Sequence, residues 1–108
     1  MSELIRPALY EAWHDIVPLA ALDRPEALYD VVGPVCESSD VLGTDRRLAI
    51  APGDGIAILS AGAYGMVMSS NYNSRPRPAE VMVDGDRAVQ VRAREAIDSL
   101  FAGETTLD

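Results

Sequence analysis

The sequence predicts a mostly-β domain, a barrel or a sandwich, with one short internal helix and one C-terminal helix. Three observations lead to this fold class. Short apolar runs of strand length recur along the chain, turns rich in glycine and proline separate them, and helical spacing is confined to short segments. The length of 108 residues suits a single compact domain whose core is only marginally sufficient.

The first part of the chain predicts one helical turn followed by two extended segments. Residues 4–14 open near a proline, which favours a turn or the first turn of a short helix. Residues 15–22 are apolar but contain a proline, so we expect an edge strand or an irregular extended piece there. Residues 27–32 predict a strand that leads into Gly33, and residues 36–40 form a polar turn after it.

The middle of the chain predicts two further strands and a short helix. Residues 48–50 and 56–59 are strand candidates, and the Pro-Gly-Asp-Gly sequence of residues 52–55 predicts a turn between them. Residues 61–65 break the strand pattern and predict a loop. Residues 66–71 are expected to form one or two helical turns before prolines force an extended backbone.

The last part predicts a β-hairpin and a terminal helix. Residues 80–83 and 88–91 alternate between apolar and polar on either side of the Asp-Gly-Asp turn at 84–86, which is a specific hairpin signal. Residues 95–101 place apolar side chains at helical spacing, with a glycine as the expected C-cap. Residues 104–108 are expected to form a frayed tail.

The composition excludes several classes of partner. A net charge of −8 and a pI of about 4.4 disfavour binding to nucleic acid or to an anionic membrane, because the field of the chain repels phosphates. No apolar run approaches the roughly 20 residues that a membrane span requires. The single cysteine cannot form an internal disulfide, and the first residues do not resemble a signal peptide. We therefore expect a cytoplasmic protein.

The chain contains no lysine, since all nine of its basic residues are arginines. This absence has a direct chemical consequence. The chain cannot itself form a Schiff base through a lysine amine.

Cys36 precedes Glu37 in a loop bounded by glycine and proline, and the pair has two interpretations. The thiol is either a packing residue next to a surface acid or a catalytic group. A neighbouring carboxylate disfavours the thiolate, so the pair suits a proton donor better than a nucleophile.

His14 is the only histidine of the chain. Its position is more typical of an imidazole that bonds to a backbone carbonyl, and a nucleophilic pair with Cys36 is the alternative. The lack of His/Cys clusters predicts no metal site.

Three other side chains are candidates for ligand contacts. Arg6 and Tyr10 share one face if their segment is helical. Tyr64 stands between small residues that let a ligand approach the backbone, and its hydroxyl can donate to a phosphate oxygen. The polar residues 71–78 are expected to form a solvated loop or a subunit contact.

Taken together, these segments resemble one family, in the same order and at nearly the same spacing. The family is that of the diaminopimelate decarboxylases, which are relatives of the ornithine and arginine decarboxylases and depend on pyridoxal phosphate. The matching stretches are Leu4-Ile5-Arg6-Pro7-Ala8-Leu9-Tyr10, Gly33-Pro34-Val35-Cys36-Glu37-Ser38, Asp40, Gly62-Ala63-Tyr64-Gly65, Ser69-Ser70-Asn71-Tyr72-Asn73, and Arg75-Pro76 before Ala79-Glu80-Val81.

The resemblance implies a role for each candidate residue. Cys36 corresponds to the proton donor and Glu37 to an acid that contacts the substrate, both delivered across a homodimer interface into the neighbouring subunit's site. Arg6 and Tyr10 correspond to substrate contacts, and Tyr64 to a tyrosine that touches both the cofactor and the substrate. Ornithine decarboxylases typically have Cys-Asp at this point, so Cys-Glu favours diaminopimelate. The implied reaction is a lyase step of lysine biosynthesis, from meso-diaminopimelate to L-lysine and CO₂.

The resemblance also implies that part of the enzyme lies elsewhere. The family's cofactor-binding lysine and its phosphate contacts belong to an N-terminal (β/α)₈ barrel, which residues 1–108 do not contain. Met1 stands at a point that is internal in full-length members. We therefore expect an incomplete C-terminal β-domain that is inactive alone and acts with the missing barrel domain or within a homodimer. The alternative is a non-catalytic interaction module or regulatory subunit that docks on a full-length decarboxylase.

Overall fold

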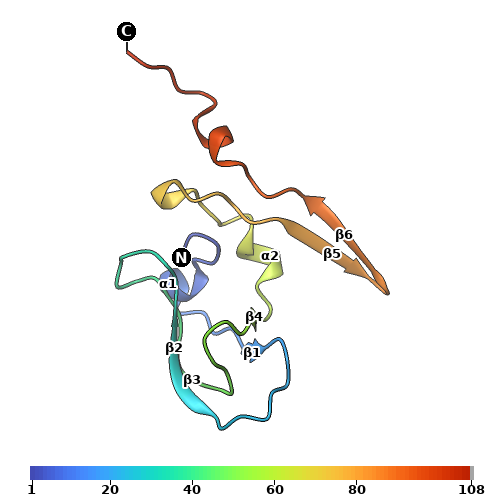
Figure 1. Cartoon of the computed structure of the whole chain (residues 1–108). Coiled ribbons are helices and arrows are strands. Elements are labelled where there is room, and N and C mark those ends of the chain that lie inside the picture. Colours follow the sequence, from blue (N-terminus) through green and yellow to red (C-terminus); the bar gives the residue numbers. More distant parts are fainter. Residues whose placement is uncertain (108) are drawn as a thin grey trace.

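The computed structural model describes residues 1–107, which contain six strands and four short helices (Figure 1). None of these helices has the length and apolar composition needed to cross a membrane. In chain order the elements are α1 (Arg6–Tyr10), β1 (Ile16–Pro18), β2 (Ala27–Val32), β3 (Val41–Leu48), β4 (Ile56–Ile58), α2 (Gly62–Gly65), the 3₁₀ helix η1 (Tyr72–Ser74), β5 (Glu80–Asp84), β6 (Arg87–Arg92) and the 3₁₀ helix η2 (Ile97–Phe101).

The strands form three separate antiparallel ladders, and the predicted mostly-β fold class is confirmed. β1 pairs with β4, β2 with β3, and β5 with β6. Within residues 1–107 the ladders do not join into a closed barrel. Each strand therefore has one edge whose backbone groups lack a strand partner.

The β2–β3 ladder confirms one predicted strand and corrects another. β2 has the predicted bounds, whereas the strand expected at 48–50 ends at Leu48 and begins at Val41. The sequence of β3 includes a glycine, an aspartate and two arginines, so no apolar alternation marks it as a strand. Its antiparallel pairing with β2 over the length of both strands supplies the missing stabilisation. Arg46 is buried within it.

The internal helix lies earlier than the sequence predicts. α2 covers the segment expected to be a loop, whereas residues 66–71, expected to be helical, form a turn at 66–68 and no regular structure at 69–71. The hydroxyl of Ser69 donates to the carbonyl of Met66 at 2.6 Å, and the Ser69 backbone N–H donates to the same carbonyl at 3.1 Å. A serine side chain that takes a backbone carbonyl in this way competes with helical hydrogen bonding. α2 itself is four residues long and includes Tyr64.

The predicted hairpin is confirmed. β5 and β6 pair so that Asp84 faces Arg87 and leaves Gly85 and Asp86 as the turn. Gly85 has a φ of 60°, in the left-handed region that glycine adopts without a steric cost.

The C-terminal helix is shorter and tighter than predicted. It is the 3₁₀ helix η2 rather than a helix over 95–101, and its C-cap is Ala102 instead of the following glycine. Residues 104–107 have no helix or strand, in agreement with the predicted tail. Asp108, the last residue of that tail, lies outside the described residues.

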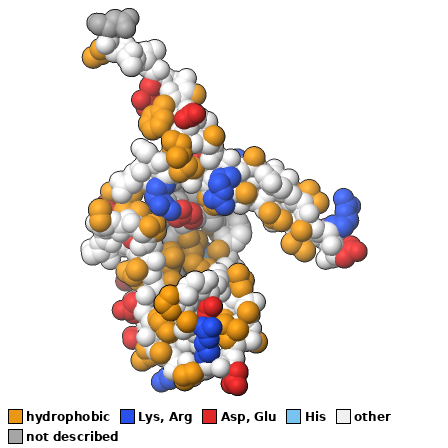
Figure 2. Space-filling model, viewed as in Figure 1, with side chains coloured by type: hydrophobic (Ala, Val, Ile, Leu, Met, Phe, Trp, Pro, Cys, Tyr) orange, Lys and Arg blue, Asp and Glu red, His pale blue; other side chains and the backbone are white. Residues whose placement is uncertain are grey.

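The buried apolar core is small. Among residues 1–107 only Leu4, Ile16, Val35 and Leu48 are buried hydrophobic side chains. The radius of gyration is 16.4 Å, whereas a compact domain of this length would have about 13 Å. The β5–β6 hairpin and the C-terminal segment project from the body, and hydrophobic side chains are spread over the visible surface (Figures 1 and 2). Much of the apolar surface is therefore not covered by the chain itself.

A polar network ties the segment before β5 to the segment after β6. The Arg77 guanidinium donates to Ser69 Oγ at 3.1 Å, to Asn71 Oδ1 at 2.9 Å and to Glu95 Oε1 at 3.2 Å. Glu95 Oε2 accepts from the Arg77 backbone N–H at 2.8 Å and from Asn71 Nδ2 at 2.6 Å. This network fixes the turn that leads into η1.

We expect the stability of the fold to fall in acid through Glu95. The hydrogen bond from the Arg77 backbone N–H, then that from Asn71, holds the pKa of Glu95 below its ordinary value. Because the folded state prefers ionised Glu95, its contribution is complete above the unfolded pKa of about 4.3 and is lost as the pH falls through the folded value. Urea unfolding at several pH values should show Glu95→Gln less stable than the unaltered chain at neutral pH, with the difference shrinking in acid.

The matched control is Glu26→Gln, which neutralises an exposed carboxylate outside this network. We expect it to leave the pH profile of unfolding unchanged. A difference between Glu95→Gln and the unaltered chain that stays constant with pH would contradict the assignment.

Candidate functional site

Cys36 and Glu37 lie at the exposed tip of a loop that Asp40 closes. The Gly33 N–H donates to the Asp40 carbonyl at 2.8 Å, and the Val35 N–H donates to Asp40 Oδ2 at 2.8 Å. The Asp40 N–H donates to the Glu37 carbonyl at 3.0 Å. The backbone and the side chain of one buried aspartate thus both hold the loop closed through hydrogen bonds. We call residues 33–40 the clamp loop.

Asp40 is 2% exposed and carries its charge inside the clamp loop. Burial raises the pKa of this carboxyl, but hydrogen bonds from the Met1 amino group and the Val35 N–H outweigh burial and hold the pKa below its ordinary value. Gly33 leaves room for the carboxylate, since a Cβ at this position would overlap both of its oxygens. The glycine and the aspartate are therefore sterically matched.

Glu37 is held by two hydroxyl groups from different parts of the chain. The Tyr72 hydroxyl donates to Glu37 Oε1, and Ser39 Oγ donates to Oε2 at 3.3 Å. The hydrogen bond to Glu37, and then the negative charge of Glu37, raise the pKa of Tyr72 above its ordinary value. Glu37 and Tyr72 line a cavity of about 430 Å³ with Met1, Ile5 and Ser70.

Arg6, Tyr10 and Tyr64 form a second group on two short helices. Arg6 and Tyr10 are the first and last residues of α1, which confirms the predicted helical segment and their spacing of one turn. The Arg6 guanidinium lies over the Tyr64 ring, 5.2 Å from its centroid, and Tyr64 belongs to α2. Tyr10 and Tyr64 are more than half exposed, so both of these side chains can meet a ligand.

The two groups are not bonded to each other within the described chain. No hydrogen bond, ion pair or cation–π contact in residues 1–107 joins Arg6 or Tyr64 to Cys36 or Glu37. His14 is buried, and its Nδ1 lies 3.0 Å from the Leu59 carbonyl oxygen, as predicted for a structural histidine. Cys36 is exposed and free. The structure therefore does not form the alternative Cys–His pair.

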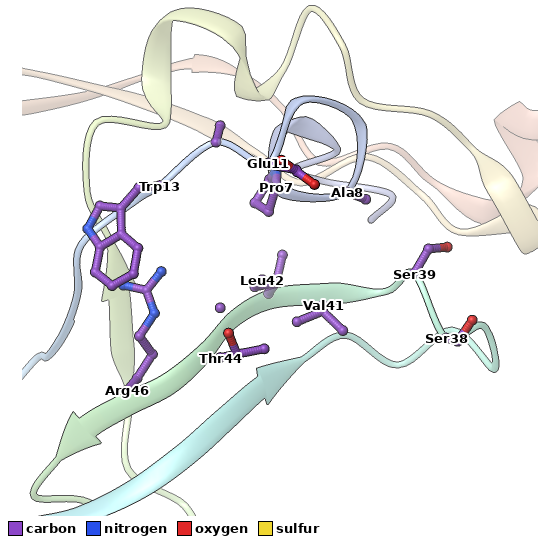
Figure 3. A pocket seen from close by; sticks show the side chains of 12 residues that line it. Pro7, Ala8, Glu11, Trp13, Ser38, Ser39, Val41, Leu42, Thr44 and Arg46 are labelled. Atoms are coloured by element: carbon purple, nitrogen blue, oxygen red, sulfur yellow. The ribbon is translucent and has the colours of Figure 1, made fainter.

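A second cavity, of about 330 Å³, lies between α1 and β3 (Figure 3). Arg46 stacks on the Trp13 ring, 3.3 Å from its centroid, and donates to the His14 carbonyl at 2.8 Å. Ser38 and Ser39 line the cavity from the clamp loop, at the opposite side from Arg46 in this view. None of the five candidate residues from the sequence lines it. Residues 1–107 also contain no cluster of metal-ligating side chains.

The sequence did not single out two residues that shape the site. Tyr72 falls within the polar segment that was expected to be a solvated loop or subunit contact, and its partner Glu37 is 35 positions away. The resemblance includes Asp40 without a stated role. The short polar turn and the glycine at its start were the only local signals for the clamp.

Comparison with known proteins identifies the fold. Residues 1–62 match the family described as pyridoxal-dependent decarboxylase, C-terminal sheet domain. The chain is 58% identical to the diaminopimelate decarboxylase of Vibrio cholerae and 59% identical to that of Haemophilus influenzae, in each case over 99% of this chain and 26% of the relative. It thus spans about a quarter of the length of these curated relatives.

Solved structures give the same result. The diaminopimelate decarboxylase from M. jannaschii in complex with L-lysine superposes with a TM-score of 0.92 at 38% identity, over 99% of this chain and 25% of that one. The Helicobacter pylori enzyme complexed with L-lysine gives a TM-score of 0.85 at 44% identity, over 94% and 25%. The chain therefore belongs to the pyridoxal-dependent decarboxylases, as a C-terminal sheet domain of the kind found in diaminopimelate decarboxylases.

Proposed function

We propose that this chain supplies the C-terminal part of a diaminopimelate decarboxylase, a lyase that converts meso-diaminopimelate to L-lysine and CO₂. The observation that carries the proposal is the exposed Cys36–Glu37 pair at the tip of the clamp loop. Identities of 58–59% to diaminopimelate decarboxylases support this choice of substrate.

Diaminopimelate has an amino-acid group at each end, and the chain offers complementary charges for the end that does not react. The Arg6 guanidinium presents a planar set of donors that matches a carboxylate. Tyr10, one turn further along α1, adds a hydroxyl to the same face. The Glu37 carboxylate suits the distal ammonium group. Holding the distal end by ionic contacts orients the other end for reaction.

Residues 1–107 fit a contact to pyridoxal phosphate but not its covalent anchor. Tyr64 is 55% exposed, and the position of Gly62 on the same helix faces open space, so a ligand can approach both. We assign Tyr64 as the residue that would contact the cofactor, while the lysine must come from outside this chain, which has none. The chemistry that the cofactor supplies when bound is withdrawal of electrons from the carbon that loses CO₂.

Cys36 is the proposed source of the final proton. Loss of CO₂ leaves a carbon that must gain one proton, and the exposed Cys36 Sγ–H can donate it as a general acid. Water then returns a proton to the thiolate.

The lack of a hydrogen bond, ion pair or cation–π contact between the two groups in residues 1–107 supports a homodimeric site. We infer that Cys36 and Glu37 of one subunit reach the site that contains Arg6 and Tyr64 of the other, together with a cofactor-bearing domain. A cytoplasmic location is consistent with the free Cys36.

The test is a graft enzyme, the Vibrio cholerae diaminopimelate decarboxylase with its matching segment replaced by this chain. We expect L-lysine formation within about tenfold of the parent's kcat/KM, a loss of less than about 1.4 kcal/mol in transition-state stabilisation. The parent lacking the segment should be inactive, as should the isolated chain. A soluble, dimeric graft that contains the cofactor but forms no L-lysine would refute the proposal.

A further inference from the structure

The Glu37 carboxylate is exposed, yet it is bound at both oxygens. A free glutamate side chain on a loop would sample many rotamers, and fixing it costs about 1.5–2 kcal/mol of conformational entropy. Here Oε1 accepts from Tyr72 and Oε2 accepts from Ser39 at 3.3 Å. Both hydrogen bonds come from side chains of the same chain, so they offset part of this cost.

The contact from Tyr72 is long-range and depends on an unusual backbone turn. Tyr72 begins η1, and the next two residues, Asn73 and Ser74, have φ values of 56° and 53°. Two consecutive left-handed residues reverse the chain here, and asparagine tolerates this conformation better than most residues. The Arg77 network fixes the same segment from the other side, through Asn71. The turn therefore presents the Tyr72 hydroxyl to a residue 35 positions earlier.

The two hydroxyl groups leave Glu37 able to bind a further donor. An ionised carboxylate offers about four lone-pair sites, and Tyr72 and Ser39 use two of them. Glu37 and Tyr72 both line the 430 Å³ cavity, so the remaining acceptor capacity is accessible from it. A tyrosine hydroxyl is protonated at neutral pH, so Tyr72 acts as the donor in its hydrogen bond to Glu37.

We propose that Tyr72 is a positioning residue that holds the Glu37 carboxylate in the orientation that binds the distal ammonium of the substrate. Tyr72 acts through Glu37 and does not take part in proton transfer. The identity of the bound group rests on the proposed function, whereas the positioning of Glu37 does not. An exposed hydroxyl with a single side-chain partner has little structural role of its own, since 44% of the Tyr72 surface is open to solvent.

The first experiment uses the 108-residue chain alone and reads ionisation instead of activity. The tyrosines are labelled at ¹³Cζ, and the chemical shift of each signal is followed by NMR as the pH is raised. The signal of Tyr72 is the one that disappears in Tyr72→Phe. We expect Glu37→Gln to move the ionisation of Tyr72 to lower pH, because the negative charge that opposes it is removed. The ¹³Cζ signal of Tyr29, whose hydroxyl donates to the Ile50 carbonyl at 3.1 Å, should keep its chemical shift at neutral pH in Glu37→Gln. If Tyr72 ionises at the same pH in Glu37→Gln as in the unaltered chain, the proposal is wrong.

The second experiment separates binding from chemistry in the graft enzyme. Tyr72→Phe should raise KM for diaminopimelate about tenfold and change kcat less than about threefold, as expected when a hydrogen bond to a charged group is lost. Tyr29→Phe is the matched control and should leave both constants unchanged. An active graft in which Tyr72→Phe leaves KM unchanged overturns the positioning role. If the graft is inactive, the proposed function fails and the titration alone decides whether Tyr72 positions Glu37.

Discussion

Replacing Cys36 with alanine should lower the kcat of the graft enzyme by about 10²–10⁴-fold, the usual contribution of a positioned general acid. The thiol lies at the tip of the clamp loop and is the chain's only cysteine, so no other thiol of residues 1–108 can substitute for it. Because Cys36 is exposed, its removal leaves no cavity in the core. KM should change little. Steady-state formation of L-lysine measures both constants.

Cys36→Ser is the informative companion variant. It keeps the size and the hydrogen-bonding capacity of the side chain but replaces the thiol with a much weaker acid. We expect it to be nearly as impaired as the alanine variant if proton donation is the role of Cys36. Activity within about threefold of the unaltered graft in either variant would exclude Cys36 as the proton donor.

Gly33→Ala should destabilise the clamp loop by about 1–3 kcal/mol, the typical cost of overpacking a fitted site. The added Cβ would overlap the Asp40 carboxylate, which cannot move without losing its hydrogen bond from the Val35 N–H. Unfolding of the chain in urea, followed by the fluorescence of its single tryptophan, measures the change. The same substitution in the graft enzyme should lower activity, because the loop carries both Cys36 and Glu37.

Gly103→Ala is the matched control for this substitution. A Cβ at Gly103 would meet nothing within 4 Å, and the backbone there is not in the left-handed region. We expect a small stabilisation of about 0.4–1 kcal/mol, because alanine restricts the unfolded chain. Equal effects of the two substitutions would show that the fit between Gly33 and Asp40 is unimportant.

The elements that the sequence predicts well are those whose stabilising contacts are local. β2 and the β5–β6 hairpin have the expected bounds to within one or two residues, because alternation and an Asp-Gly turn lie in adjacent positions. β3 was missed because its strand character comes from pairing with β2 instead of from its own composition. α2 was misplaced because the Ser69 hydroxyl bonds to the Met66 carbonyl, so the segment after α2 forms a turn instead of the expected helix.

The same distinction applies to the site. The spacing of Arg6 and Tyr10 on one helix, and the exposure of Cys36 and Glu37 on one turn, follow from neighbouring residues. The contact of Tyr72 with Glu37 joins distant segments, and no local pattern encodes it. Resemblance to a family supplied roles for five residues, but physical contacts were needed to find the sixth.

The clamp loop also differs from the rest of the site in the order in which it can form. Its hydrogen bond from Val35 to Asp40 spans five residues, so the loop can close on the timescale of local chain diffusion, about 10–100 ns for a short loop. The stacking of Arg6 on Tyr64 needs segments from the start and the middle of the chain. The proton-donor half of the site can therefore assemble during synthesis as soon as Asp40 is available, while the carboxylate-binding half waits for α2.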